Sequence, residues 1–287
     1  MIALALHGGA GARRGRDYST EIAHMREVAT QARESLRAGG RAFDVVTEAV
    51  VALEDSGLYV AGRGASPNAA GQFELDASLM RGADQACGAV AVLQNFQNPI
   101  LVARAVLEKT PHVMLAGDGA VQFATDQGMT PLPGGETWFT RAGRFESNHP
   151  PGTLNHGTVG CVCLDSHGEL AAATSTAGVF GKLPGRVGDT PLIGAGTWAD
   201  PQTAVSCTGQ GEYFIRVNAA AQLAFRHRSG EGLDEAANDV LGQIAGMGGE
   251  GGLIAVNAAG HVSVPFRSQG MKRAWFSGDG DIFSEAY

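Results

Sequence analysis

The most constraining feature of the sequence is a pair of apolar stretches that a very short turn connects. The first, VGCVCLD, covers residues 159–165, and the second, GELAAATS, covers residues 168–175, with the turn in the sequence SHG. Two such stretches so close together predict a β-hairpin with antiparallel strands. Because side chains alternate along a strand, Thr174 and Thr176 share a face, and we expect one of them to lie beside Thr158.

Helical and strand patterns follow one another irregularly along the rest of the chain. Strand 2–7 precedes two helices, and the first of these carries a serine or threonine cap signal. The segments 192–200 and 203–209 are expected to continue the sheet of the hairpin. This order predicts antiparallel-rich sheets covered by helices, an α+β layered sandwich, and not a βαβ repeat. The other expected elements are helices 19–40, 42–57, 99–108, 118–127, 211–227 and 232–245, strands 72–80 and 88–95, a hairpin over 252–266, and a strand near 273–278.

Composition and charge exclude several classes of protein. The chain has 287 residues, of which 44% are hydrophobic, enough for one large domain or two small ones. The net charge is −8, and no basic cluster is present, which argues against nucleic acid or anionic membrane as a partner. The first apolar run is too short for a signal peptide, and no stretch is long enough to cross a membrane. We therefore expect a soluble cytoplasmic protein.

No pattern in the sequence predicts an organic cofactor or a catalytic metal. The glycine-rich stretches at 6–12 and 246–252 lack the lysine and hydroxyl residue of a phosphate-binding loop. The four cysteines contain no CxxC pair, and the eight histidines show no metal-ligand spacing. The 42 glycines predict many tight turns.

A long segment before the hairpin has the composition of a linker. Residues 131–157 are rich in proline and glycine without a period, which is typical of a loop. Loops of this length inside a compact domain usually have a function. The segment ends in Gly157, directly before Thr158.

The pair Gly157-Thr158 raises the possibility of a self-made nucleophile. A threonine hydroxyl needs a base, and an N-terminal threonine has one in its own α-amino group, whose pKa is about 7.7–8.0. That amine exists only after the bond before Thr158 is cut, and a glycine at 157 tolerates the backbone strain of such a cut. The alternative is that Thr158 is simply the first β-branched residue of a strand.

Two further motifs fit an amino-acid hydrolase. Thr208-Gly209 ends a strand before a helix, where a hydroxyl and a backbone amide can form an oxyanion hole; the alternative is an ordinary turn with a capping threonine. Arg186 and Asp189 stand three residues apart among glycines. Together they can hold the α-carboxylate and the α-ammonium of an amino acid; the alternative is a local Arg–Asp ion pair.

Six motifs together resemble one family over nearly the whole chain. They are LALHGGAG, HGTVG, AAATSTAG, KLPGRVGDTPLIGAG, SCTGQGE and GGEGGLIAV, and they are similar to the plant-type asparaginase/isoaspartyl peptidase family of N-terminal nucleophile hydrolases. The resemblance implies a single domain, 1–287, with a four-layer αββα sandwich. It also implies self-cleavage between Gly157 and Thr158, which gives an α chain, 1–157, and a β chain, 158–287.

The resemblance also implies roles for individual residues. The cleaved enzyme would hydrolyse β-aspartyl dipeptides and L-asparagine, with Thr158 as the nucleophile and Thr176 as its support. Thr208 and Gly209 would form the oxyanion hole, and Arg186 and Asp189 would hold the substrate's charged ends. A turn near the site is formed by His7, Gly8 and Gly9. A structural sodium ion would be held by the main-chain carbonyls of Leu53, Glu54, Ser56, Tyr59, Ala61 and Arg63.

The resemblance implies a homodimer of αβ units acting on a small-molecule substrate. Two other functions stay open at this point. One is a glycosylasparaginase-like amidase that acts on sugar-linked asparagine. The other is an uncleaved, non-catalytic relative that binds an amino acid, which is suggested by Val60 and Ala177, where the family usually has asparagine and glycine.

Overall fold

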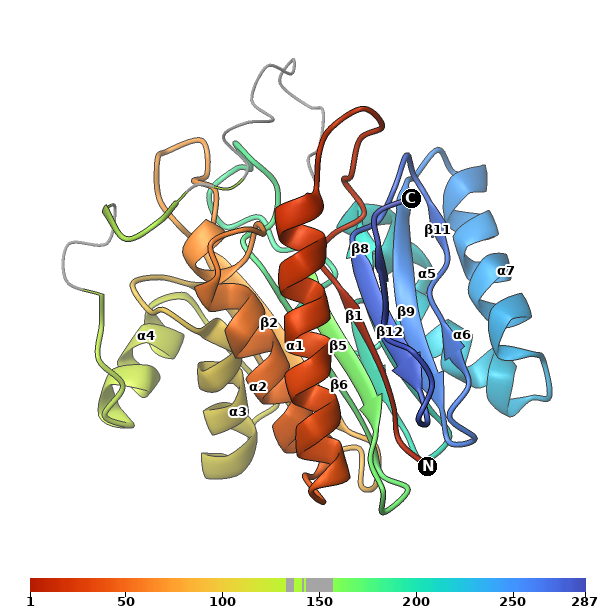
Figure 1. Ribbon diagram of the computed structural model, residues 1–287. Helices are drawn as coiled ribbons and strands as arrows, with labels where there is room; N and C mark the ends of the chain where they lie inside the picture. Colours follow the sequence, from red (N-terminus) through yellow and green to blue (C-terminus); the bar gives the residue numbers. More distant parts are fainter. Residues whose placement is uncertain (133–136, 141, 143–156) are drawn as a thin grey trace.

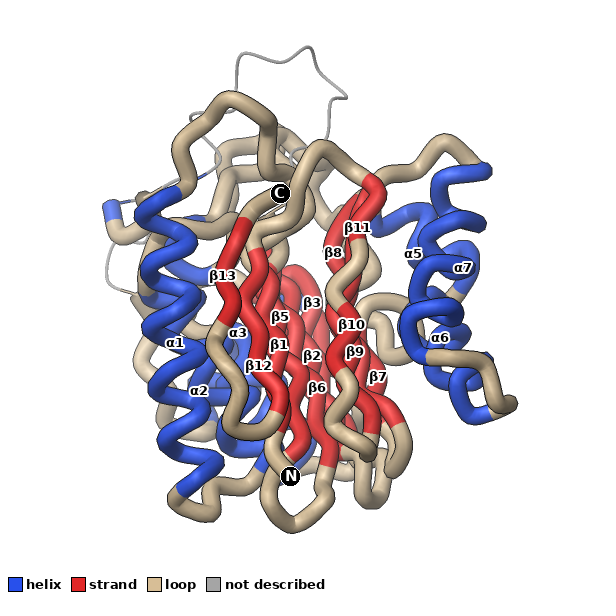
Figure 2. The backbone as a smooth tube through the Cα atoms, turned by 45° about the vertical axis from the view of Figure 1, so that its right-hand side comes forward, coloured by secondary structure: helices blue, strands red, loops and turns tan. Residues whose placement is uncertain are grey.

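The computed structural model describes residues 1–132, 137–140, 142 and 157–287, and the strands in these residues form two sheets (Figures 1 and 2). The predicted linker 131–157 lies mostly outside them. The larger sheet has the order β13-β12-β1-β5-β6-β2-β3-β4, and only β3 and β4 pair in parallel. Its strands are β1 (Ala3–His7), β2 (Leu75–Arg81), β3 (Cys87–Leu93), β4 (Met114–Ala116), β5 (Val159–Leu164), β6 (Leu170–Thr176), β12 (Arg273–Ser277) and β13 (Phe283–Glu285).

The smaller sheet has the order β10-β9-β8-β7, with β11 also paired to β9. Helices cover the outer face of each sheet, so the layers run helix, sheet, sheet, helix (Figure 2). The strands are β7 (Thr197–Ala199), β8 (Thr203–Gly209), β9 (Gly251–Asn257), β10 (Val262–Ser263) and β11 (Phe266–Arg267). The helices are α1 (Ser19–Arg37), α2 (Ala42–Asp55), α3 (Pro99–Lys109) and α4 (Gly117–Asp126) beside the larger sheet, and α5 (Gly211–Val217), α6 (Ala219–Arg228) and α7 (Leu233–Gly246) beside the smaller.

Three apolar layers hold this sandwich together. Helix α2 packs on β5 and β6 through buried side chains at helical spacing, among them Phe43, Val46, Val50 and Leu53. Each such side chain stabilises the fold by about 1.5–3 kcal/mol relative to an exposed one. The layer between the two sheets is rich in alanine, which lets the sheets approach closely. A third layer joins the smaller sheet to α5, α6 and α7. The predicted four-layer α+β sandwich is confirmed.

The predicted hairpin is formed by β5 and β6 at the centre of the larger sheet. Val159 pairs with Ser175, so the next position along brings Thr158 opposite Thr176. Strand β1 flanks β5 on its other side, with His7 opposite Gly160. The ends of three adjacent strands therefore meet at Thr158.

Several expected elements differ from the structure. The segments 192–200 and 203–209 do not extend the hairpin's sheet, because β7 pairs with β8, and β8 pairs with β9, in the second sheet. The expected helix 211–227 is two helices, since Asn218 adopts a left-handed conformation with φ of 47°. Helix α1 begins after Tyr18 without a side-chain cap; Asp17 accepts a hydrogen bond from the Ser19 amide instead. Strands β4 and β13 were not predicted.

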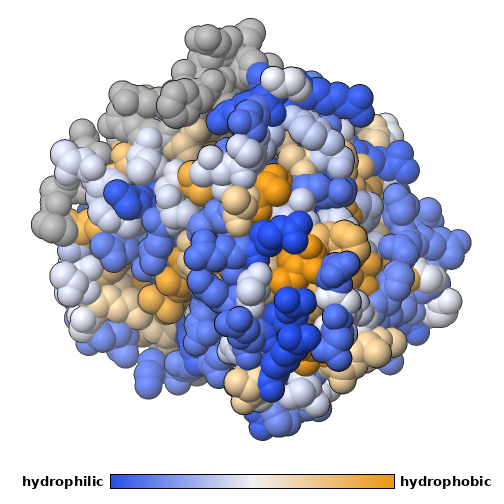
Figure 3. Space-filling model, viewed as in Figure 1, coloured by the Kyte–Doolittle hydropathy of each residue, from blue (hydrophilic) through white to orange (hydrophobic). Residues whose placement is uncertain are grey.

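On the face shown in Figure 3, hydrophilic side chains alternate with small apolar patches. No helix in the described part of the chain combines the length and the apolar character that a membrane span requires.

Candidate active site

Thr158 and Thr176 meet through their hydroxyl groups at the ends of β5 and β6. The two Oγ1 atoms are 3.1 Å apart, and Thr176 Oγ1 also accepts a hydrogen bond from the Gly178 amide at 3.0 Å. Thr158 is 6% exposed and opens into a small hollow. The prediction that one threonine of β6 lies beside Thr158 is confirmed, and it is Thr176; Thr174 points into the space between the sheets.

The peptide bond before Thr158 is held by the main chain of Val60. The Val60 amide donates to the Gly157 carbonyl oxygen at 3.1 Å, and the Val60 carbonyl accepts from the Ala177 amide at 2.9 Å. A Cβ atom at position 157 would lie 2.3 Å from Val60 Cγ2, so only glycine fits. Sequence reasoning missed this contact, because it runs through main-chain atoms that no side-chain pattern reveals.

The turn at 7–9 supports Thr158 from behind. His7 is fully buried, and burial lowers its pKa to about 3, so the ring is neutral. Its Nδ1 therefore carries the hydrogen and donates to the Thr158 carbonyl oxygen at 3.0 Å, while Nε2 accepts from the Ser206 hydroxyl at 2.8 Å. Gly8 leaves room for the Tyr59 ring, because a Cβ there would lie 2.5 Å from Tyr59 Cε1. Gly9 has a positive φ of 99°.

The glycine of the HGTVG motif makes room for the His7–Ser206 contact. A Cβ atom on Gly160 would lie 2.1 Å from Ser206 Oγ and 2.5 Å from His7 Nε2. We expect Gly160→Ala to lower the free energy of unfolding by about 1–3 kcal/mol through overpacking, measured by thermal or denaturant unfolding. The control is Gly242→Ala on α7, where a Cβ meets no neighbour within 4 Å and should slightly stabilise the helix. Equal melting temperatures for Gly160→Ala and the wild type would contradict this explanation.

Thr208 and Gly209 end β8 as predicted. The Thr208 hydroxyl oxygen accepts a hydrogen bond from the Ala10 amide at 3.3 Å, which leaves its own hydrogen free to donate. Gly209 lines the hollow beside Thr158, and a Cβ there would lie 2.6 Å from the Glu250 carbonyl oxygen. Thr208 is not a helix cap, because α5 begins after Gln210.

Arg186 and Asp189 line the same hollow but do not pair with each other. Arg186 Nε and Nη2 donate to Glu212 Oε1 of α5 at 2.9 and 2.8 Å, so no local Arg–Asp ion pair forms. Glu212 was not predicted to take part, although it belongs to the SCTGQGE motif. Asp189 is buried, and its Oδ2 has no hydrogen-bond partner in the described residues. Burial raises the pKa of Asp189 to about 7, and the nearby Arg186 opposes that rise.

Buried charged residues attach the loop that carries Arg186 to the start of β2. Lys182 Nζ donates to the Glu74 carbonyl oxygen at 3.1 Å and lies 3.6 Å from Glu74 Oε2 and 3.9 Å from Asp76 Oδ2. Glu74 Oε1 accepts from the Gly185 amide at 2.9 Å. Because an unpaired buried charge is costly, these contacts hold the loop tightly to β2. No local pattern predicts this cluster, because Lys182 and Gly185 are about 110 residues away from Glu74.

The six residues predicted to hold sodium lie in the last turn of α2 and in the loop that follows it. Gly62 and Gly64 bring the chain back so closely that a Cβ on Gly64 would lie 1.8 Å from the Tyr59 carbonyl oxygen. The carbonyl oxygens of Leu53, Tyr59, Ala61 and Arg63 each accept a hydrogen bond from a nearby donor. A carbonyl oxygen has a second lone pair, so this oxygen-only set fits a hard cation such as sodium.

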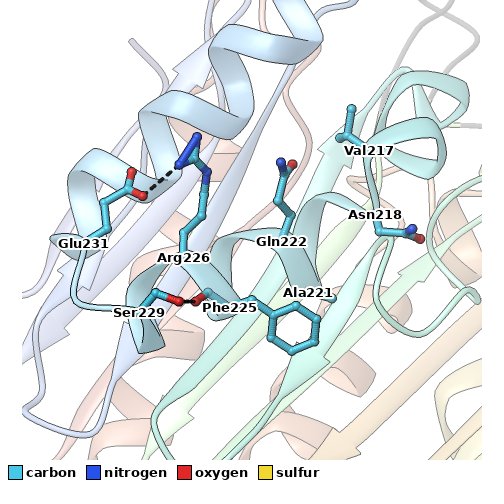
Figure 4. Close-up of a pocket in the computed structure, with 8 residues that line it drawn as sticks. All are labelled: Val217, Asn218, Ala221, Gln222, Phe225, Arg226, Ser229 and Glu231. Carbon is cyan, nitrogen blue, oxygen red and sulfur yellow. Dashed lines mark hydrogen bonds and ion pairs between the residues drawn. The ribbon is translucent and has the colours of Figure 1, made fainter.

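A larger hollow than the one beside Thr158 lies elsewhere, on α6 of the outer helical layer (Figure 4). It is an open groove of about 550 Å³ with Phe225, Gln222 and the Arg226–Glu231 ion pair on its walls. None of the residues that carry the chemistry of Thr158 lines it. We therefore place the candidate active site in the smaller hollow, where a threonine hydroxyl, an arginine and an aspartate with one unpartnered oxygen converge.

Known proteins resemble this chain along almost its entire length. A family model described as asparaginase matches residues 1–283. The isoaspartyl peptidase of Salmonella typhimurium is 44% identical over 96% of both chains, and that of Escherichia coli is 42% identical over 96% of this chain and 93% of its own. The human isoaspartyl peptidase/L-asparaginase is 42% identical over 90% of this chain and 87% of its own. The chain therefore belongs to the asparaginase family.

Proposed function

We propose that the chain cuts itself before Thr158 and then hydrolyses β-aspartyl amide bonds. Its substrates are isoaspartyl dipeptides and L-asparagine, which gives L-aspartate and ammonia. One observation carries the proposal: the Thr158 hydroxyl shares a hollow with Arg186 and with Asp189, whose Oδ2 has no hydrogen-bond partner in the described residues. These groups match the reactive and the charged parts of an aspartyl substrate. The names of the relatives support these two substrates over a sugar-linked asparagine, and an uncleaved binding protein would not need the paired hydroxyls.

The proposed cut transfers the Gly157 acyl group from nitrogen to oxygen. Thr158 Oγ1 attacks the Gly157 carbonyl carbon, the bond to the Thr158 nitrogen breaks, and the hydroxyl proton passes to that nitrogen. The Val60 amide, which already donates to the Gly157 oxygen, stabilises the charge that develops there. Water then hydrolyses the ester. The products are an α chain, 1–157, and a β chain, 158–287, that begins with a free amine.

In the proposed hydrolysis the new amine takes the proton from its own hydroxyl. Thr176 holds the Thr158 oxygen in place while this oxygen attacks the side-chain amide carbon of the substrate. The Thr208 hydroxyl and the Gly209 backbone stabilise the oxyanion, and ammonia or an amino acid leaves with the transferred proton. Water then releases aspartate from the ester.

The experiment is a denaturing gel and a substrate panel on the purified protein. We expect two fragments, the smaller with threonine at its N-terminus, and release of aspartate from L-asparagine and from a β-aspartyl dipeptide. Preference for a sugar-linked asparagine would point to the glycosylasparaginase-like alternative. An intact chain that binds aspartate without turnover would point to the non-catalytic alternative and overturn the proposal.

Arg186 provides a graded test of the carboxylate site. We expect Arg186→Lys to raise the KM for L-asparagine about 10- to 100-fold, because lysine loses the two-pronged grip of guanidinium on a carboxylate. The control is Arg104→Lys on α3, because Arg104 pairs with the carboxylates of Asp44 and Glu108 and does not line the hollow. Steady-state kinetics would measure both. A KM equal to that of the wild type would remove Arg186 from substrate binding.

We also propose a bound ion and an assembly state, which the family resemblance implies, and a location in the cell. A structural sodium ion would lie on the carbonyl oxygens of Leu53, Glu54, Ser56, Tyr59, Ala61 and Arg63 and stiffen the turn that positions Val60. The cleaved protein would be a homodimer of αβ units. Its place would be the cytoplasm, where thiols stay reduced, and the four cysteines form no disulfide in the structure.

A further inference from the structure

A row of buried side chains crosses repeatedly between the two sheets behind Thr158. It begins at the Thr158 carbonyl oxygen, which accepts from His7 Nδ1 of the larger sheet. His7 Nε2 contacts Ser206 Oγ of the smaller sheet at 2.8 Å, and Ser206 Oγ lies 2.7 Å from Thr174 Oγ1 of the larger sheet. The exposure of all three side chains is zero.

The row continues toward the loop that carries Asp189. Thr174 Oγ1 lies 2.6 Å from Thr197 Oγ1 of β7, and Thr197 Oγ1 lies 2.8 Å from Ser78 Oγ of β2. Ser78 then donates to the Thr190 carbonyl oxygen at 2.6 Å. Thr190 directly follows Asp189, so the row connects the main chain of the nucleophile to the main chain of the ammonium-binding residue. We call it the hydroxyl chain.

The hydroxyl chain has fewer hydrogens than contacts. Its six contacts end in carbonyl oxygens on both sides, and a carbonyl oxygen can only accept. The four hydroxyl groups and one neutral imidazole supply five hydrogens. One contact is therefore always left with two lone pairs facing each other. Rotation of the hydroxyls moves this gap among the five contacts between His7 Nε2 and the Thr190 carbonyl, while the His7 Nδ1 hydrogen stays on the Thr158 carbonyl. When a hydrogen occupies a contact at one end of the row, a different contact toward the other end is left without a hydrogen.

We propose that the hydroxyl chain is a positioning device that couples the placement of Thr158 to the occupancy of the Asp189 site. Binding of a substrate ammonium at Asp189 shifts the neighbouring Thr190 carbonyl, and the hydroxyls redistribute their hydrogens up to His7 Nε2. The hold on this nitrogen then sets how the His7 ring, through its Nδ1 hydrogen, positions the Thr158 carbonyl. None of the four hydroxyl residues lines the hollow, so they act through Thr158 and Asp189 and not on the substrate. This inference rests on the proposed function.

The test cuts the row at three places with Ser78→Ala, Thr197→Val and Ser206→Ala. We expect each variant to lower kcat for L-asparagine about five- to tenfold, the effect of one lost hydrogen bond of roughly 1 kcal/mol or slightly more. Any two cuts together should cost no more than one, because groups that act as a unit are not additive. Thr197→Ser keeps the hydroxyl that Thr197→Val lacks, so its kcat should equal that of the wild type. Rates are expressed per cleaved and folded molecule; denaturing gels measure the cleaved fraction, and thermal unfolding shows that each variant is folded.

The matched control is Thr203→Val. Thr203 and Ser206 are both buried hydroxyl residues of β8, but the Thr203 hydroxyl has no hydrogen-bond partner in the described residues. The kcat of Thr203→Val should therefore equal that of the wild type. If the single effects multiply in the double variants, or if the cuts lower only the melting temperature, the coupling is overturned while the proposed function stands. A wild-type protein that hydrolyses neither substrate overturns both.

Discussion

Thr158→Ala protein should remain a single uncut chain and should hydrolyse neither L-asparagine nor β-aspartyl dipeptides. The substitution removes the only atom that attacks in both proposed steps, Oγ1, which lies 3.1 Å from Thr176 Oγ1. Loss of a catalytic nucleophile typically lowers kcat by about 10⁴- to 10⁶-fold. A denaturing gel after long incubation and an ammonia-release assay would measure the two effects.

The control for this prediction is Thr158→Ser, which keeps a hydroxyl and loses one methyl group. It should still cut itself and turn over, at reduced rates. Because the Thr158 side chain is nearly buried and small, both variants should retain the fold, and unfolding curves would verify this. Cleavage at the same bond in the alanine variant would contradict the role of Thr158.

The hairpin of β5 and β6 is the part of the fold that the sequence predicts best. The turn SHG and the alternating strands predict that Thr174 or Thr176 lies beside Thr158, and the register of the structure shows that it is Thr176. Local signals of this kind need no knowledge of distant parts of the chain. The same holds for Thr208-Gly209, whose place between a strand and a helix follows from the neighbouring residues.

Contacts between distant segments were beyond the sequence. The partner of Arg186 is Glu212 from the next helix, although the local arrangement suggested Asp189. The assignment of β7 and β8 to a second sheet depends on packing across the alanine-rich layer, which strand propensity does not encode. The hydroxyl chain joins residues up to 199 positions apart, and each one alone resembles an ordinary strand residue.

Asp189→Asn should lower kcat/KM for L-asparagine about 10²- to 10³-fold. In the proposed function the Asp189 oxygen that lacks a partner receives the substrate ammonium, and loss of one member of a buried charge pair costs about 2–5 kcal/mol. Asparagine has nearly the same shape, so the effect reports the charge. Kinetics with L-asparagine would measure it, and a variant with full kcat/KM would place the ammonium elsewhere.

The pH dependence of kcat/KM distinguishes the ionisation of Asp189 from that of the Thr158 amine. The pKa of Asp189 is raised to about 7, so below that pH the free enzyme loses the ionised carboxylate that binds ammonium. The Thr158 amine must also be neutral, with a pKa of about 7.7–8.0. Log kcat/KM should therefore fall with a slope approaching two on the acid side in the wild type. The slope should be one in Asp189→Asn, and an unchanged slope would contradict the assignment.

The same substitution should stabilise the protein at alkaline pH. Because the folded-state pKa of Asp189 lies above its unfolded value of about 3.9, the folded state favours the protonated carboxyl. Its contribution to stability is fully present below pH 4 and is lost as the pH rises through about 7. Asp189→Asn never ionises, so its free energy of unfolding should match the wild type near pH 4 and exceed it at pH 8. Denaturant unfolding at both pH values would measure this. We expect Asp189→Asn to be less active than the wild type and more stable only at pH 8, where the wild-type carboxylate is charged. This combination would indicate that the protein keeps a destabilising buried charge because the charge binds the substrate.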